Sequence, residues 1–226
     1  WRCHQCRKPT PTTDKEHFER VREWVEKDKA WAQAMLGQWY RDGECGLKQS
    51  YVMAVTLFEK AVEQGDSGAM YGLALLYKHG QGVDHSYEKA AELYTMAAEQ
   101  GRATAMTNLG ALYRDGNGVV QSFTKAIELF TMAADQGIVE AMTFLGVMYI
   151  HGQGVHQSNE LAREWWTKAA NEGNEGSEIA IQNLKVLDKA EGKSTTTAST
   201  TPPASPPSIC CSSCNTPQPS GQIFRK

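Results

Sequence analysis

A glycine motif that recurs every 36 residues is the feature that most constrains how this chain can fold. Copies of Gly-x-Gly-Val begin at Gly80, Gly116 and Gly152, and an earlier version with one extra residue runs from Gly43 to Leu47. A fixed period of about 20–50 residues is typical of repeat proteins, in which each unit packs only against its neighbours. The sequence therefore predicts an array of like units instead of a single globular core.

Three further series of residues keep the same period. Each first glycine has a tyrosine three positions before it and a serine and an alanine after it, while a second glycine closes each unit. The tyrosines are Tyr40, Tyr77, Tyr113 and Tyr149, the serines are Ser50, Ser86, Ser122 and Ser158, and the closing glycines are Gly65, Gly101, Gly137 and Gly173. Series that coincide in this way over four copies are not chance.

The segments between these glycines have the apolar spacing of helices. In the unit that ends at Gly101, apolar residues follow Ala90 at i+3, i+4, i+7 and i+8, which places them on one face of a helix. Ser86 stands where a helix N-cap belongs, and Gly101 stands where a left-handed C-cap belongs. Each unit is thus a helix, a glycine turn and a second helix. We predict an all-α fold, a right-handed α-solenoid of about four 36-residue helix–turn–helix repeats with capping helices.

The repeat resembles a known family. The pattern A-M-x-x-L-G-x-x-Y-x-x-G-x-G-V, followed by Q-S-x-x-K-A-x-x-L-F-x-x-A-A-x-x-G, is similar to the Sel-1-like repeat, a relative of the tetratricopeptide repeat, over residues 28–187. Two positions depart from it, because Asp28 replaces a closing glycine and Gln182 replaces a small residue in a fifth copy of the first helix. The resemblance implies a scaffold or adaptor that binds other proteins and is not an enzyme.

Composition divides the chain into three parts. Residues 14–189 form the predicted repeat domain, which opens with a capping helix over 14–27. Within residues 190–226, the stretch 194–208 is almost all Ser, Thr, Ala and Pro, which cannot bury a core, and three cysteines follow it. We predict a disordered tail there, with its cysteines either free or engaged in metal binding or lipidation. Residues 1–13 hold a Cys-x-x-Cys pair and a linker.

The spacing of Cys3 and Cys6 would let a tight turn direct both thiolates toward one zinc ion. Two ligands fill only half of a tetrahedral site, and a pair of free thiols is the alternative. With Arg7 and Pro9 the motif resembles the last knuckle of a RING-type finger. That resemblance implies zinc and a ubiquitin-conjugating enzyme as partners of a longer protein, whereas this chain alone is predicted to hold no cofactor.

Charge and composition argue against several function classes. The formal net charge of −3 gives no attraction to nucleic acid or to a membrane surface, and no apolar run is long enough to span a bilayer. His79 and His151 stand in the same repeat position two units apart, too far to share a metal ion. The glycine turns lack the lysine of a phosphate-binding loop. The scarcity of cysteine in the repeats favours reduced thiols and a cytoplasmic or nuclear protein.

The first helix of each repeat lines the concave side in tetratricopeptide-type arrays, and the resemblance implies the same here. One position, four residues after the small residue of the Leu-Gly pair, is occupied by Arg41, Lys78, Arg114 and Ile150. The predicted partner-binding groove comprises Arg41, Tyr71, Lys78, Thr107, Arg114 and Thr143. Because guanidinium groups form forked bonds with carboxylates, we predict that the groove binds an acidic segment or a C-terminal carboxylate. In the alternative, Arg41 and Arg114 pair locally with Asp42 and Asp115.

We therefore predict a protein-interaction scaffold or adaptor that binds partner proteins through this groove. The alternative is the substrate-binding part of a RING-type E3 ubiquitin ligase whose finger is truncated in this chain.

Overall fold

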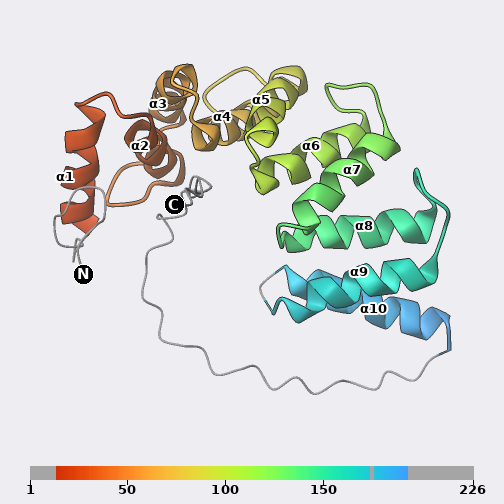
Figure 1. Ribbon diagram of the computed structural model, residues 1–226. Coiled ribbons are helices and arrows are strands. Elements are labelled where there is room, and N and C mark those ends of the chain that lie inside the picture. The colour runs from red at the N-terminus through yellow and green to blue at the C-terminus, as the bar shows by residue number, and fades with distance from the viewer. Residues whose placement is uncertain (1–13, 174–175, 193–226) are drawn as a thin grey trace, which may run out of the picture. The chain divides into compact units, whose positions relative to one another are not determined.

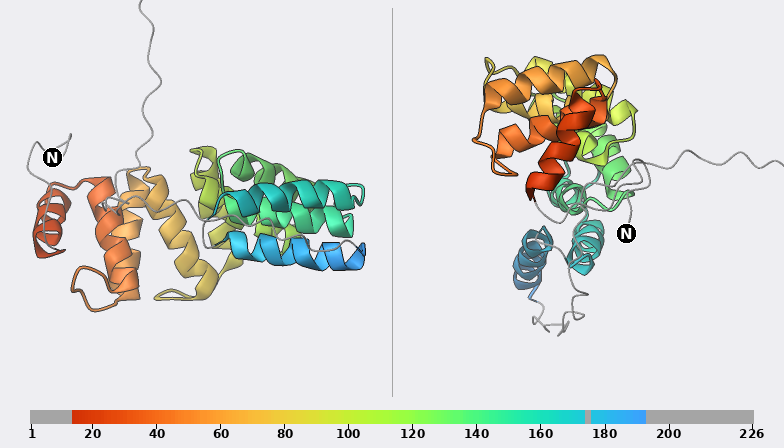
Figure 2. Two further views of the ribbon diagram at one scale, coloured as in Figure 1. Left: turned by 90° about the horizontal axis from the view of Figure 1, so that it is seen from below. Right: turned by 90° about the vertical axis from the view of Figure 1, so that its left-hand side faces the viewer.

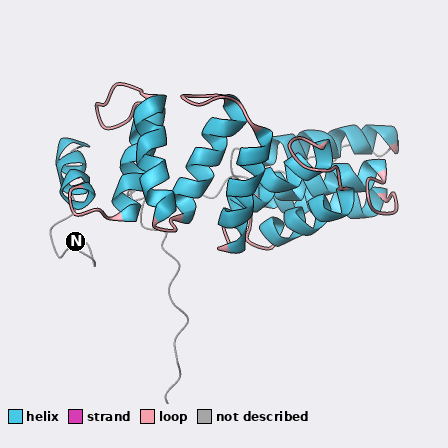
Figure 3. Ribbon diagram, turned by 90° about the horizontal axis from the view of Figure 1, so that it is seen from above, coloured by secondary structure: helices cyan, strands magenta, loops and turns pink. Residues whose placement is uncertain are grey.

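The structure is a computed structural model that describes residues 14–173 and 176–192, and every regular element in these ranges is an α-helix (Figures 1 and 3). The helices are α1 (Asp14–Val25), α2 (Ala30–Asp42), α3 (Tyr51–Glu63), α4 (Ser67–His79), α5 (Tyr87–Glu99), α6 (Ala103–Asp115), α7 (Phe123–Ala134), α8 (Val139–His151), α9 (Asn159–Asn171) and α10 (Ser177–Ala190). No strand occurs in this part of the chain, and the predicted all-α helical-repeat fold is confirmed.

The helices are joined as successive hairpins. The pairs α2–α3, α4–α5, α6–α7 and α8–α9 are the repeats, and α10 is the first helix of a further copy. Each helix contacts the one before it and the one after it. Helix α2 also contacts α4, and α8 contacts α10, so these two pairs of first helices approach one another. Figure 2 shows the last three helices, α8 to α10, lying side by side.

A serine N-cap begins each second helix. The hydroxyl of Ser86 accepts the backbone N–H of Lys89 at 3.2 Å, and that of Ser122 accepts the N–H of Lys125 at 3.3 Å, as predicted. The backbone N–H of Ser86 donates in turn to the carbonyl of Tyr77 at 3.0 Å, and the other three serines bond their tyrosines in the same way. Because each pair closes its turn, the tyrosine and serine series keep the same period.

In the last three turns the second glycine packs against the preceding repeat, as Gly82, Gly118 and Gly154 show. Gly118 has a φ of +67°, and a Cβ at this position would overlap the carbonyl group of Tyr87 at the start of α5. Both the backbone conformation and the lack of space therefore require glycine. The closing Gly101 has a φ of +83°, which agrees with the left-handed cap predicted for it.

A large aromatic residue of each second helix fills the space between first helices. These residues are Phe58, Tyr94, Phe130 and Trp166, all of them buried and spaced by 36 positions. Phe130 lies against Gly110 and Trp166 lies against Gly146, where any larger side chain would overlap the ring. The Trp166 indole N–H also donates to the backbone carbonyl of Thr143 at 3.1 Å. This alternation of large and small residues fixes how the repeats pack.

The two ends of the described array differ in how far they are covered. At the start, Val21 of α1 is buried against α2, with Phe18 and Trp24 packed beside it. At the other end, Ile179 and Val186 of α10 are 61% and 59% exposed. Helix α1 therefore caps the first repeat, while α10 presents apolar residues on its outer surface.

Candidate partner-binding surface

The predicted row lies in the last turn of the first helices. Arg41, Lys78, Arg114 and Ile150 are the penultimate residues of α2, α4, α6 and α8. The last turn of a helix carries unpaired carbonyl groups and the negative end of the helix dipole, which favours a cation there. The row therefore brings positively charged side chains to the same end of three successive first helices.

Two arginines of the row pair with the aspartate that follows them. Arg41 donates to Asp42 through Nε and Nη2 at 2.8 and 2.7 Å, and Arg114 donates to Asp115 at 2.7 and 3.0 Å. The hydrogen bond to Asp42 raises the pKa of Arg41 above its ordinary value, against the effect of burial. The structure thus forms the local pairs that the sequence offered as the alternative.

Lys78 has no such local partner, because a histidine follows it. His79 occupies the position that Asp42 and Asp115 hold in the neighbouring repeats. The Lys78 ammonium donates instead to the side-chain oxygen of Asn108 on α6, at 3.1 Å. Burial lowers the pKa of Lys78, and the charge of Asp115 opposes this. Among the described residues, no carboxylate lies within 4.0 Å of this ammonium group.

Tyr71 is the centre of a cluster that the sequence predicted only in part. The Arg102 guanidinium carbon lies 5.7 Å from the centre of the Tyr71 ring, and the ring of buried Tyr94 lies 5.8 Å away. Burial raises the pKa of Tyr71, while the charges of Arg41 and Arg102 and the side chain of Asn108 oppose the shift. The cluster therefore joins side chains from α2, α4, α5 and α6.

Arg102 was not predicted from the sequence, because it lies outside the periodic helix positions. It is the N-cap residue of α6, directly after the closing glycine, where Asp66 precedes α4 and Ile138 precedes α8. Asp66 accepts the backbone N–H of Ala69 at 2.8 Å, whereas Arg102 makes no side-chain cap bond. A comparison of this one position across the copies would have shown a cation where a capping side chain is usual.

Two residues of the predicted groove are buried. Thr107 and Thr143 are each 7% exposed, and their hydroxyl groups donate to the carbonyls of Ala103 at 3.0 Å and Val139 at 2.9 Å. Such a bond to the carbonyl four residues earlier satisfies a threonine inside a helix. This corrects the prediction for both threonines: they occupy the packing between helices and leave no room there for a peptide.

Farther along the array, aromatic side chains replace the polar ones. Phe144 of α8 occupies the position that Asn108 holds one repeat earlier. Its ring lies 5.0 Å from the ring of Phe130, and the Arg114 guanidinium carbon lies 4.9 Å from its centre. The apolar surface of Phe144 is therefore shielded by an arginine that also holds Asp115.

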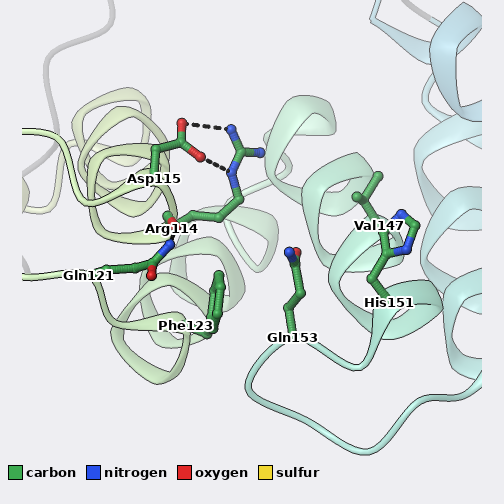
Figure 4. Close-up of a pocket in the computed structure, with 7 residues that line it drawn as sticks. All are labelled: Arg114, Asp115, Gln121, Phe123, Val147, His151 and Gln153. Atoms are coloured by element: carbon green, nitrogen blue, oxygen red, sulfur yellow. Dashed lines mark hydrogen bonds and ion pairs between the residues drawn. The ribbon is translucent and has the colours of Figure 1, made fainter.

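An open hollow of about 440 Å³ lies between the ends of α6 and α8 (Figure 4). The Arg114–Asp115 pair stands on one side, together with Gln121, whose amide donates to the Arg114 carbonyl at 2.7 Å. Val147 and His151 of α8 stand on the other side. We name the surface that joins these groups the first-helix face, formed by Arg41, Tyr71, Lys78, Arg102, Asn108, Arg114, Phe144, Val147 and Ile150.

Metal and membrane chemistry find no support in the described ranges. His79 and His151 end α4 and α8, two repeats apart, and no three His, Cys, Asp or Glu side chains in these ranges could hold a metal ion together. None of the helices described is long and apolar enough to cross a bilayer. The predicted half-site of Cys3 and Cys6 and the predicted disordered tail lie outside the described residues, so neither is tested.

Comparison with known proteins agrees with the repeat boundaries. The family model of the Sel1 repeat matches residues 32–66, 67–101, 103–138 and 139–174. The crystal structure of c5321, a protective antigen of uropathogenic Escherichia coli with an SLR fold, is 33% identical with a TM-score of 0.70, over 77% of this chain and 36% of that one. A Sel1 repeat protein from Oxalobacter formigenes is 26% identical with a TM-score of 0.68, over 80% and 73% of the two chains. This chain thus spans about a third of the length of the antigen. No curated protein sequence matches it.

Proposed function

The chain belongs to the Sel1 repeat family, and from that premise we propose that it is a scaffold that binds an extended segment of a partner protein along the first-helix face. Sel1 repeat proteins serve as protein-interaction scaffolds, which supports this role at the level of the family. The partner of this particular chain follows from the chemistry of its own surface.

One observation carries the proposal: polar and aromatic groups with unused binding capacity follow one another across three repeats. Lys78 and Arg102 hold no carboxylate among the described residues, and the hollow beside Val147 is open to solvent. An extended peptide gains affinity when its side chains meet such groups at regular intervals. The Arg41–Asp42 and Arg114–Asp115 pairs would border the peptide rather than bind it, because their charges already compensate each other.

Selection of binding peptides from a random displayed library, followed by affinity measurement on blocked variants, tests this proposal. Ala111 lies on α6 next to the face and is partly buried, so Ala111→Trp would obstruct it. Met132 lies on the outer side of second helix α7 and is 52% exposed, so Met132→Trp adds the same bulk elsewhere.

We expect Ala111→Trp to lower the affinity for the selected peptides by at least about tenfold, and a tenfold loss corresponds to about 1.4 kcal/mol. Met132→Trp should change the affinity by less than about twofold. Circular dichroism shows whether both variants keep their helices. The opposite ranking, with Met132→Trp abolishing binding and Ala111→Trp leaving it intact, would place the partner on the second helices and reject the proposal.

The ligase alternative stays a prediction. It rests on the motif of Cys3, Cys6, Arg7 and Pro9, which lies outside the described residues and before the first match to the family model. The zinc ion, the ubiquitin-conjugating enzyme and the cytoplasmic or nuclear location inferred from the sequence have the same standing. No contact among the described residues favours them over the scaffold role.

A further inference from the structure

Three buried side-chain atoms within the described ranges have no hydrogen-bond partner, and two of them belong to residues that contact Tyr71. They are the hydroxyl oxygen of Tyr94, Nε of Arg102 and the hydroxyl oxygen of Thr104. Tyr94 and Arg102 lie against the Tyr71 ring, whereas Thr104 lies one turn before Asn108 on α6. Because buried polar groups are almost always hydrogen-bonded, the two unpaired atoms beside Tyr71 point to a ligand.

The Tyr94 hydroxyl is not needed to fill the core. The same position one repeat earlier and one repeat later holds Phe58 and Phe130, which pack between first helices without a hydroxyl. Tyr94 is 0% exposed, so its hydroxyl is removed from water without gaining a bond in return. A polar atom that packing does not require and that water cannot reach calls for another explanation.

The two cations of this cluster lie outside the ion pairs that hold Arg41 and Arg114. Lys78 donates to the neutral amide of Asn108, and Arg102 lies over the Tyr71 ring. Acids lie nearby, because the Asp115 charge acts on Lys78 and Asp66 stands beside the Arg102 guanidinium at Gly68, but neither forms an ion pair within 4.0 Å. Because acids surround the two cations, a singly charged carboxylate suits the cluster better than a doubly charged phosphate.

We propose that Tyr71, Lys78 and Arg102 bind one carboxylate of an acidic peptide on the first-helix face, with Tyr94 as a positioning residue beneath them. Arg102 and Lys78 would supply charge-assisted hydrogen bonds. The Tyr71 phenol would donate to the ligand, and a shift of its ring on binding would bring its oxygen within reach of the Tyr94 hydroxyl, which has no partner in the free protein. This inference rests on the proposed scaffold function, because it names the chemistry of the segment that the face binds.

A nuclear magnetic resonance titration tests the site with defined probes. Acetyl-Ala-Glu-Ala-amide carries a side-chain carboxylate, acetyl-Ala-Gln-Ala-amide carries none, and acetyl-trialanine carries only a C-terminal carboxylate. We expect the glutamate peptide or acetyl-trialanine to shift the Arg102 Nε–H resonance and the backbone amides of α4 and α6, and the glutamine peptide to leave them unchanged. The stronger of the two acids identifies the source of the carboxylate.

Substitutions with matched controls locate the effect. Lys78→Met and Arg102→Met keep the aliphatic part of the side chain. Each should lower the affinity for the acidic peptide that binds by about tenfold. Lys60→Met on α3 and Arg22→Met on α1 remove the same charges from exposed positions elsewhere and should change the affinity by less than about twofold. If the two controls lower the affinity as much as Lys78→Met and Arg102→Met do, the binding is general charge attraction and the proposed site is wrong. Shifts of arginine resonances throughout the protein would lead to the same conclusion.

Tyr94→Phe separates a binding role from a structural one, because its neighbours Phe58 and Phe130 show that phenylalanine fits this position. We expect the melting temperature to stay the same or rise, and the affinity for the acid to fall by about threefold to tenfold. A lower melting temperature with unchanged affinity would contradict the assigned role. A phosphoserine peptide that binds more tightly than the glutamate peptide would also overturn the choice of carboxylate.

The failure of this inference can be told apart from that of the scaffold proposal. If library peptides are blocked by Ala111→Trp but are unaffected by Tyr94→Phe and by replacement of their own acidic residues, the face binds partners without this carboxylate site. If Ala111→Trp has no effect on them, the scaffold proposal itself is wrong.

Discussion

Two neighbouring sections of the first-helix face have the same architecture and opposite chemistry. The α4–α6 section holds Lys78, Tyr94, Arg102 and Asn108. The α6–α8 section holds, at positions 36 residues later, Arg114, Phe130, Ile138 and Phe144. In the α4–α6 section the Lys78 ammonium donates to the Asn108 side chain, and the buried Tyr94 hydroxyl has no partner. In the second, an arginine that is paired with an aspartate covers two packed aromatic rings.

The difference shows how a repeat array can vary a surface without disturbing its core. Tyr94 and Phe130 have nearly the same volume, and both are fully buried at equivalent places. Asn108 and Phe144 lie on the outside of that packing, where each is only partly buried. The periodic glycines, alanines and leucines that hold the repeats together are common to both sections, so the four variable positions are the ones available for recognition.

The largest effect we predict tests whether the two sections share one kind of core. Leu109 is 3% exposed and its equivalent one repeat later, Leu145, is 1% exposed. Leu109→Ala and Leu145→Ala should each lower the free energy of unfolding by about 2–5 kcal/mol, because each opens a cavity between packed helices. Urea unfolding of both variants measures this. A cost below about 1 kcal/mol for one of them would show that its section is packed differently.

The next prediction moves the unpaired hydroxyl to the other section. Phe130→Tyr would bury a phenol beside Phe144, where the neighbouring groups are apolar. We expect a loss of about 1–3 kcal/mol in stability from the uncompensated desolvation of the hydroxyl. Thermal and urea unfolding, with Leu93→Met as a mild control in the partly buried set, measure the loss. Full stability in this variant would mean that the core tolerates a buried hydroxyl anywhere, and Tyr94 would then need no ligand to explain it.

A third prediction exchanges the residues that set the charge of the two sections. His79→Asp places a carboxylate directly after Lys78, as Asp42 and Asp115 follow their arginines. The new carboxylate should compete for the Lys78 ammonium group and lower the affinity for acidic peptides by about threefold to tenfold. The stability should change by only about 0–1 kcal/mol, as is usual for a surface ion pair. The reverse change, Asp115→His, releases Arg114 and should raise the affinity for acidic peptides. Binding assays at two salt concentrations measure both, and identical affinities in both variants would remove the charge argument.

The sequence predicted the fold well because the residues that define it are periodic. Ser86, Gly101 and the turn glycines take part in backbone bonds that every repeat needs, so their spacing alone revealed the hairpins. The binding surface was predicted less well, because it depends on what differs between copies. Arg102 breaks the pattern at a cap, and the local pairs of Arg41 and Arg114 depend on the rotamers of adjacent side chains.

The threonines show a second limit of the sequence. Rotational position placed Thr107 and Thr143 on the same side of their helices as Tyr71, but packing within the array buries both of them. The hydrogen bonds that make this burial possible go to carbonyls four residues earlier, and any threonine within a helix could form them. A helical wheel therefore could not distinguish the buried positions from the exposed ones.

The smallest effect we predict is a pH dependence that belongs to the α4–α6 section. Burial lowers the pKa of His79 below its ordinary value of 6.5, and the positive charges of Lys78 and His85 lower it further. The unfolded chain therefore takes up a proton at this residue at a higher pH than the folded chain does. The contribution of neutral His79 to the stability of the folded protein is present above pH 6.5 and is lost as the pH falls through the folded pKa. His79→Gln keeps a polar side chain without a titrating group, so it should flatten the stability profile below pH 6.5. Because His79 is mostly exposed, solvent screens the interaction and the change should be small beside that of Leu109→Ala.

Urea unfolding at intervals of half a pH unit measures this change. Lys78→Met serves as a second variant that removes the neighbouring charge. A Lys78→Met profile that stays parallel to the parent profile throughout this range would show that the Lys78 ammonium does not act on His79, and a parallel His79→Gln profile would show that His79 contributes nothing to the pH dependence.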